Sequence, residues 1–263
     1  GDFVSTVKLI SQQTDGQDAD AGLMVRNDVT QTAKSPGYVV LYRRQKYGGG
    51  IDWCGDLDGD GLTDVISYGH GVQAQTFPLW LKIEKVGTSF IGYSSRDGTL
   101  WQKGQIQQTA IMEGEYEIPF AEENQGVGIY ANEQSATNNL NRVEFQDFKI
   151  EQQVPALFQD LKISKTTIGV DDHFSISTTV TNNGSVQGPV KAGIFIDGHE
   201  PFSRWIDLKP GESRVVFFET TPAEIQKALW YVVLPGFISG THEIGIGSSP
   251  SQKITIVESK NQY

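Results

Sequence analysis

Short runs of alternating apolar and polar residues recur along the chain, and they are bounded by Gly, Asn, Asp and Pro. Such period-two runs, spaced about 8–12 residues apart, predict the strands of an all-β sandwich or jelly roll. In the run VEFQDFKI, Val143, Phe145 and Phe148 are expected to face the core. The clearest predicted strands of the N-terminal part are residues 3–10, 37–42, 79–85, 89–94, 127–130 and 143–150.

A domain boundary is predicted near residues 151–155, where polar residues are followed by Pro155. The second part contains further strand-like runs: FQDLKIS, HFSISTTVTNNG, VKAGIFIDG, ESRVVFFET, HEIGIG and SQKITIVES. About seven strands in about 100 residues favour an immunoglobulin-like sandwich. We therefore expect an all-β chain, with a concanavalin-like jelly-roll sandwich over residues 1–152 and an immunoglobulin-like sandwich over residues 156–263.

One short helix is predicted over residues 221–229, with Thr221 as the N-cap and Pro222 at the first helical position. An unusually apolar run follows at residues 229–238. It is either a core strand with a turn or an exposed docking patch, because Trp and Tyr side chains often anchor interfaces. The residues that would contact a partner are Trp230, Tyr231 and Phe237.

The charge of the chain narrows the classes of partner. Lys and Arg number 21 and Asp and Glu number 32, which gives a formal net charge of −11. A polyanion repels phosphate backbones, so nucleic acid is not an expected partner. No run approaches the roughly 20 apolar residues that span a bilayer. The single cysteine, Cys54, excludes an internal disulfide and a cysteine-based zinc site.

One loop has the pattern of a calcium site. Residues 56–64 (DLDGDGLTD) place carboxylates at loop positions 1, 3, 5 and 9, and Gly61 at position 6 permits a sharp turn. Calcium prefers six to eight oxygen ligands, and alternate residues of a tight loop turn their oxygens inward. The expected ligands are the side chains of four residues and the carbonyl of a fifth: Asp56, Asp58, Asp60, Asp64 and Leu62.

The surroundings of this loop differ from those of an EF-hand. Ser67 stands where an EF-hand has Glu, and strand-like runs flank the loop on both sides. The loop resembles the calcium loop of integrin-type FG-GAP repeats, which joins two strands. We expect bound Ca²⁺ to clip a long hairpin together without taking part in catalysis. The alternative is a solvated acidic hairpin tip.

No catalytic constellation stands out in the sequence. There is no G-x-S-x-G motif, and Cys54 has no neighbouring His. Glu113, Glu115 and Glu117 alternate along one predicted strand, which favours a solvated face over an acid–base pair across a cleft. The four histidines are scattered and are expected at the surface or in loops: His70, His173, His199 and His242.

The first domain resembles the laminin-G/concanavalin-like jelly rolls of secreted bacterial and archaeal proteins. The resemblance rests on six segments: AGLMVRN, GYVVLY, LWLKI, YSSRDGTLW, GVGIYAN and VEFQDFKI. That family usually carries another strand before the one at residues 3–10. The resemblance therefore implies an exposed strand edge, unless another element covers it, and such an edge can support self-association.

The second domain resembles the CARDB type of bacterial adhesion-related immunoglobulin-like domain. The segments that carry this resemblance are SISTTVTNNGSVQGPV, AGIFIDG and LKPGES. Together the two resemblances imply a non-catalytic prokaryotic protein, exported to the cell surface or beyond, that binds a glycan or a cell-surface protein. The alternative is a structural subunit of a surface layer, filament or adhesin.

Concanavalin-like modules hold sugars through aromatic faces and a few hydrogen-bonding side chains. For each aromatic candidate the alternative is core packing. The candidate ligand-binding residues are Arg26, Trp53, Tyr68, Trp80 and Trp101.

Overall fold

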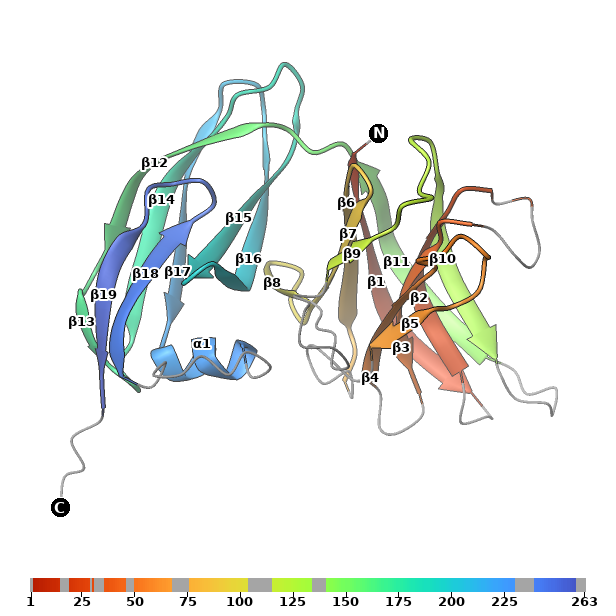
Figure 1. Cartoon of the computed structure of the whole chain (residues 1–263), viewed down its shortest axis with the longest axis horizontal. Coiled ribbons are helices and arrows are strands. Elements are labelled where there is room, and N and C mark those ends of the chain that lie inside the picture. Colours follow the sequence, from red (N-terminus) through yellow and green to blue (C-terminus); the bar gives the residue numbers. More distant parts are fainter. Residues whose placement is uncertain are drawn as a thin grey trace. The chain divides into compact units, whose positions relative to one another are not determined.

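The computed structural model describes residues 2–14, 19–28, 30, 36–45, 50–67, 76–103, 115–133, 141–229 and 239–258. The chain divides into two compact units, Gly1–Gln152 and Gln153–Tyr263 (Figure 1). Each unit is a β-sandwich, so the predicted all-β fold class is confirmed. In the part of the chain that the structure describes, no helix has the length and hydrophobicity that crossing a membrane would require.

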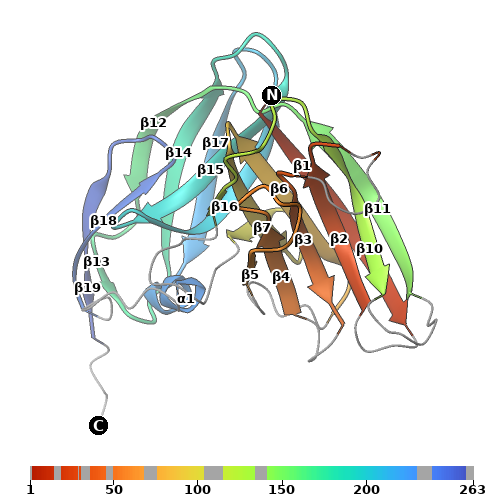
Figure 2. The same cartoon turned by 45° about the vertical axis from the view of Figure 1, so that its right-hand side comes forward.

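The first unit consists of two antiparallel sheets (Figures 1 and 2). One sheet has the order β11-β1-β6-β7-β8, with β9 paired to β7, so β1 is paired on both sides and the strand edge expected to be exposed at residues 3–10 is covered by β11. Its strands are β1 (Phe3–Thr14), β6 (Leu79–Val86), β7 (Ser89–Ser95), β8 (Leu100–Lys103), β9 (Glu115–Glu117) and β11 (Asn141–Glu151). The other sheet has the order β10-β2-β3-β4-β5. Its strands are β2 (Ala19–Arg26), β3 (Val39–Arg44), β4 (Gly50–Gly55), β5 (Val65–Ser67) and β10 (Gly126–Glu133).

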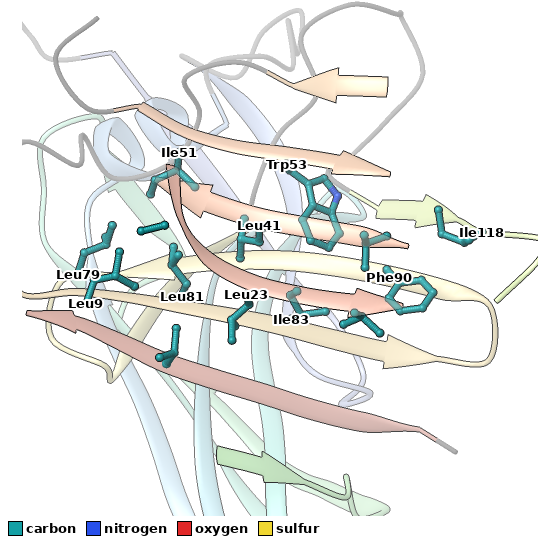
Figure 3. Close-up of a cluster of buried hydrophobic side chains, with 14 residues drawn as sticks. Leu9, Leu23, Leu41, Ile51, Trp53, Leu79, Leu81, Ile83, Phe90 and Ile118 are labelled. Carbon is teal, nitrogen blue, oxygen red and sulfur yellow. The ribbon is translucent and has the colours of Figure 1, made fainter. Parts of the chain in front are cut away.

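The core of the first unit lies between these two sheets. Alternate residues of each strand point inward, because successive side chains of a strand project to opposite faces. Figure 3 shows Leu9, Leu81 and Ile83 of one sheet close to Leu23 and Leu41 of the other. The inward side chains are almost completely buried. Most outward positions of β2, β3 and β4 are buried as well, and partial exposure is found at Met24, Arg26 and Arg44.

The core prediction for the closing strand β11 is only partly right. Val143 and Phe145 pack against the core, but Phe148 is 42% exposed. Phe148 stands three residues after Phe145, so unbroken alternation would put the two side chains on opposite faces. The pairing of β1 with β11 shifts between Thr6 and Lys8, and Asp147 has a φ of 52°, which marks a bulge beside Phe148. Since β11 is also the end strand of its sheet, its side chains are covered from one side only.

The second unit also has two sheets. One has the order β16-β15-β18-β19-β13, in which β13 and β19 are parallel, and the other has the order β12-β14-β17. The first of these comprises β13 (Thr167–Gly169), β15 (Gly188–Ile196), β16 (His199–Leu208), β18 (Gly240–Ile246) and β19 (Gln252–Val257). The second comprises β12 (Ala156–Ile163), β14 (Phe174–Asn182) and β17 (Ser213–Thr220).

The predicted short helix is present as α1 (Pro222–Ala228). Thr221 caps its N-terminus, because the Thr221 hydroxyl accepts a hydrogen bond from the Glu224 N–H and the Glu224 carboxylate accepts one from the Thr221 N–H. This reciprocal capping box satisfies two N–H groups that the first turn leaves without a helical partner. The apolar run that follows, including Trp230, Tyr231 and Phe237, lies outside the described residues except for its first residue.

Candidate metal centre and candidate ligand-binding face

The acidic loop connects β4 to β5 as a hairpin. Asp56 follows directly after β4, and the Asp64 N–H donates to the Gly55 carbonyl across the base of the loop at 3.1 Å. Gly59 and Gly61 have φ values of 82° and 77°, a region in which a side chain is strained. The alternation of Asp with Gly is therefore what lets the chain turn twice within nine residues.

Asp56 is fully buried and organises the loop from inside. Its Oδ1 accepts a hydrogen bond from the Gly59 N–H at 2.8 Å. Its Oδ2 accepts one from the Gly61 N–H at 3.1 Å and one from the Gly37 N–H at 3.0 Å. Since Gly37 lies just before β3, Asp56 ties the loop to the neighbouring strand as well as to itself.

Three carboxylates converge on one point of this loop. One oxygen from each of Asp56, Asp58 and Asp64 lies within 4.8 Å of the others. Calcium–oxygen distances of about 2.3–2.6 Å put any two ligands of one ion within about 5 Å of each other, so the three oxygens fit a single Ca²⁺. Asp64 is held in place because its Oδ2 accepts the N–H groups of Leu57 and Asp58 at 2.6 and 3.1 Å.

Asp60, another predicted ligand, is exposed and does not belong to the converging group; its Oδ1 accepts the Leu62 N–H at 2.6 Å. The ligand predicted at Leu62 is its backbone carbonyl, and that stays a prediction; the Leu62 side chain is half exposed. The structure thus assembles Asp56, Asp58 and Asp64 and leaves Asp60 turned toward the loop backbone.

Two aromatic side chains hold the loop against the sandwich. A Cβ on Gly59 would lie 2.7 Å from the ring of Phe120, so the loop backbone sits directly on that ring. The Tyr38 hydroxyl is hydrogen-bonded to the hydroxyl of Thr63. Burial, opposed by this hydrogen bond and assisted by the negative charges of Asp56 and Asp64, raises the pKa of Tyr38 to about 12.

The aromatic residues proposed to bind a ligand do not form one site. Trp53 is 1% exposed and packs in the core between the sheets, so its ring cannot stack on a ligand in this structure. Trp101 is also buried, with the Lys82 Nζ 3.9 Å from its ring centroid. Trp80 is partly exposed on the outward face of β6, beneath Lys8.

Arg26 belongs to the other sheet. Leu23 and Val25 of β2 face the core, so Arg26 projects from the outward face of the five-stranded sheet, where it is partly buried. Tyr68, the remaining candidate, lies outside the described residues.

The outward face of the five-stranded sheet carries an aromatic pair that sequence reasoning missed. Tyr42 of β3 and Tyr130 of β10 are both register partners of Gly22 on β2. Because Gly22 has no side chain, the two rings approach across it, with centroids 5.9 Å apart and planes tilted by 60°. The available sequence signal was the alternation of Tyr38, Tyr42 and Arg44 with the core residues of the same run.

An ion-pair network adjoins this aromatic pair. The Arg44 Nε lies 3.1 Å from Asp52 Oδ2 and 3.6 Å from Asp20 Oδ1, and both carboxylates are buried. An Arg44 Nη donates to the Tyr42 hydroxyl at 2.7 Å. Burial raises the pKa of both tyrosines, that of Tyr130 to about 12, so their hydroxyls stay protonated at neutral pH. One face thus combines two rings, protonated hydroxyls, a guanidinium and two carboxylates.

Comparison with known proteins identifies no family for this chain. No protein-family model matches the chain, and no curated protein matches it. Among solved structures, the chain is similar to a functionally unknown protein from Saccharomyces cerevisiae, with 16% sequence identity and a TM-score of 0.44. The match covers 59% of this chain and 71% of the yeast protein. A similarity at this level supports no conclusion about fold or function.

Proposed function

We propose that the chain is a non-catalytic, calcium-stabilised binding module of a prokaryotic cell surface or extracellular medium, and that its ligand is carbohydrate. The observation that carries the calcium part is the convergence of Asp56, Asp58 and Asp64 within 4.8 Å. The proposal keeps the laminin-G/concanavalin-like assignment for the first unit and the CARDB-type assignment for the second.

The role proposed for calcium is structural. Three carboxylates so close together repel one another, and a bound dication would remove that repulsion. The loop that Ca²⁺ would rigidify is joined to the start of β3 through Gly37 and rests on Phe120. Calcium would therefore fasten the β4–β5 hairpin to the segments on either side of it.

Carbohydrate is the ligand class that suits the outward face of the five-stranded sheet. Sugars bind through the apolar face of the ring, which stacks on aromatic side chains, and through hydroxyl groups that need both donors and acceptors. Tyr130 offers a partly exposed ring and Arg44 a partly exposed guanidinium, and the buried Tyr42, Asp20 and Asp52 hold these two side chains in place. These groups lie side by side on adjacent strands, as one sugar ring would require.

The non-catalytic part of the proposal is supported by the state of the most nucleophilic side chain on this face. Cys54 is buried beside Val40 and Tyr42. Burial, reinforced by the negative charges of Asp52 and Asp20, raises the pKa of its thiol to about 12. The thiol is therefore protonated at neutral pH and is a poor nucleophile.

Thermal unfolding in EDTA and in millimolar calcium tests the metal. We expect the native chain to be stabilised by about 2.7 kcal/mol at a hundredfold excess of calcium over Kd, since the ion binds only the folded state. A double variant, Asp58→Asn with Asp64→Asn, should melt at the same temperature with and without calcium. An unchanged melting temperature of the native chain would reduce the loop to an acidic hairpin tip.

An oligosaccharide array tests the ligand independently of the metal. The native chain should give a signal that Tyr130→Ala abolishes and Tyr130→Phe largely keeps, because the ring provides the stacking surface. Phe217→Ala, in the second unit, is the control for an aromatic removed elsewhere. Equal signals from the native chain and Tyr130→Ala would reject this face as the site.

A structural role in a surface assembly is the second candidate, and one observation favours it. Val215 and Phe217 of β17 are 62% and 57% exposed. Among the described strands β17 pairs only with β14, so it also forms one edge of its sheet. Exposed apolar side chains on a free edge favour contact with another chain. Concentration-dependent sedimentation without sugar, abolished by Val215→Ser with Phe217→Ser, would support this candidate; a monomer at high concentration would exclude it.

A further inference from the structure

The second unit contains a cavity that the proposed function leaves unused. It has a volume of ≈390 Å³, and it is lined by the paired ends of β15 and β18 and by the turns that follow them in the β15–β16 and β18–β19 hairpins. This volume suits one side chain or a small ligand. Its lining comes entirely from these two hairpins: Phe195, Asp197, Gly198, Glu243, Gly245, Gly247, Ser249 and Ser251.

The lining is arranged as a buried floor and an exposed rim. Gly245 and Ser249 are buried, whereas Asp197, Glu243 and Ser251 are exposed. A Cβ on Gly245 would meet nothing closer than the Ser249 carbonyl at 3.6 Å. That distance is an ordinary van der Waals contact, and the Ser249 hydroxyl and the Ser251 Cα lie at 3.7 Å, so these residues already cover Gly245.

Both ionisable residues of the lining are acidic. Asp197 is fixed, because its Oδ1 accepts the Glu243 N–H at 2.8 Å and its Oδ2 lies 2.6 Å from His242 Nδ1. His242 itself is buried and is not part of the lining. Among the described residues, the Glu243 carboxylate accepts one long hydrogen bond, from the Ser251 hydroxyl at 3.3 Å. Glu243 thus retains acceptor capacity at the rim, and Asp197 adds a negative charge held in a set position.

An aromatic ring completes the lining. Phe195 is the register partner of Gly245, so the two lie opposite each other on adjacent strands, and the ring is partly exposed. An aromatic face attracts a cation placed over it, and the attraction grows as water is excluded. A carboxylate and an aromatic face together suit a group that is both cationic and partly apolar.

We propose that this cavity binds an organic cation, namely the guanidinium or ammonium group of an Arg or Lys side chain presented by a partner protein. The head group would pair with Glu243 and Asp197 at the rim, while the aliphatic stem would lie along Phe195. A guanidinium suits the site best, because it pairs with carboxylates in a planar geometry and stacks on aromatic rings. This interaction goes beyond the proposed carbohydrate site, which lies in the first unit and uses other residues.

Titration with three small probes tests the proposal on the full chain. The probes are N-acetyl-arginine methylamide, the corresponding lysine derivative and the neutral citrulline derivative, and binding is followed through backbone amide chemical shifts. We expect shifts at Gly245, Gly247 and Ser251 with the two cationic probes, the arginine derivative binding more tightly, and no such shifts with citrulline. Equal binding of the citrulline derivative would overturn the proposal, because the cavity would then recognise the shape or the hydrogen-bonding groups of the probe and not its charge.

Three variants locate the site and separate it from general attraction to an acidic protein. Glu243→Gln, which keeps the shape of the side chain, should weaken the arginine probe about fivefold. Phe195→Ala should weaken binding by removing the aromatic face, and an unchanged melting temperature would show that it still folds. Glu219→Gln removes an exposed charge from β17 and should leave binding unchanged. If Glu219→Gln weakened binding as much as Glu243→Gln, or Phe195→Ala bound normally, the cavity would not be the site.

Discussion

Asp56 Oδ2 accepts a hydrogen bond from the Gly61 N–H, five residues later in the same loop, at 3.1 Å. This contact and those from Gly59 and Gly37 give the buried carboxylate three backbone donors. Asp56 therefore has a structural role in the loop that does not depend on a bound metal. Asp58 is exposed, and within the described part of the chain it accepts one backbone hydrogen bond, from the Asp60 N–H, so it has no comparable role.

Substitutions at these two positions should separate the two roles. In EDTA we expect Asp56→Ala to destabilise the fold by about 2–4 kcal/mol, because it leaves three N–H groups without an acceptor. Asp58→Ala should cost less than about 1 kcal/mol in EDTA. Urea unfolding measures both, and a larger loss for Asp58→Ala than for Asp56→Ala would contradict the assignment.

The contact between Gly59 and Phe120 predicts a steric effect on stability. Gly59→Ala places a Cβ 2.7 Å from the Phe120 ring, whereas Gly87→Ala meets nothing within 4 Å, and both glycines have positive φ. We expect Gly59→Ala to cost about 1–3 kcal/mol more than Gly87→Ala, since only the first adds overpacking to backbone strain. Denaturant unfolding of both variants checks this, with Phe120→Ala in the Gly59→Ala background as the rescue. Equal losses of stability in the two glycine variants would show that the Phe120 ring moves aside at no cost, which would contradict this prediction.

The hairpin between β7 and β8 predicts a pH dependence. Burial works against ionisation of Asp97, but the N–H groups of Leu100 and Thr99 and the side chains of Thr99 and Ser95 donate to its carboxylate and together lower its pKa to about 2. Because the folded-state pKa lies below the unfolded-state value, this residue stabilises the fold above about pH 4. That stability is lost as the pH falls from about 4 to about 2.

Comparison of the native chain with Asp97→Asn measures this contribution. The carboxylate is exposed, so solvent screening reduces the expected difference to about 1 kcal/mol or less at pH 6. Urea unfolding at pH 6 and at pH 2.5 should show the advantage of the native chain shrinking at the lower pH. An equal difference at both pH values would mean that ionisation of Asp97 does not contribute.

The raised pKa of Cys54 predicts its reactivity toward alkylating reagents. At pH 8 the folded chain should react with iodoacetamide at least about a hundredfold more slowly than a chain unfolded in guanidinium, because the thiolate is scarce and buried. Mass spectrometry of quenched samples follows the modification. Rapid labelling of the folded chain would show that the outward face of the five-stranded sheet opens readily, and the non-catalytic proposal would lose its support from this thiol.

Strand and helix positions were largely predictable from local patterns. The alternation at residues 79–85 predicts β6 to within one residue, and the Thr-Pro start at 221–222 predicts the capped helix α1. Both signals are local, since side-chain direction in a strand and capping at a helix start depend on residues only a few positions apart. The prediction fails at Phe148, which lies beside a bulge on the end strand β11 and is 42% exposed.

Histidine placement shows the same limit. The prediction of a surface or loop position is wrong for His242, which is buried on the same inward face of β18 as Ile244 and Ile246. Its partner, Asp197, is 45 residues away in the sequence. A polar residue is tolerated inside when such a distant partner satisfies it, and a local pattern cannot supply that information.

The acidic loop could be predicted from the local sequence, whereas the face of the five-stranded sheet could not. The spacing of Asp56, Asp58 and Asp64 lies within nine residues, so the sequence alone determined that these carboxylates could meet around one ion. The aromatic and ionic groups of the sheet face come from four strands, because Asp20, Tyr42, Asp52 and Tyr130 meet only through the register of β2, β3, β4 and β10. Strand order and register depend on long-range packing and pairing, and only the tertiary structure decided which side chains share that face.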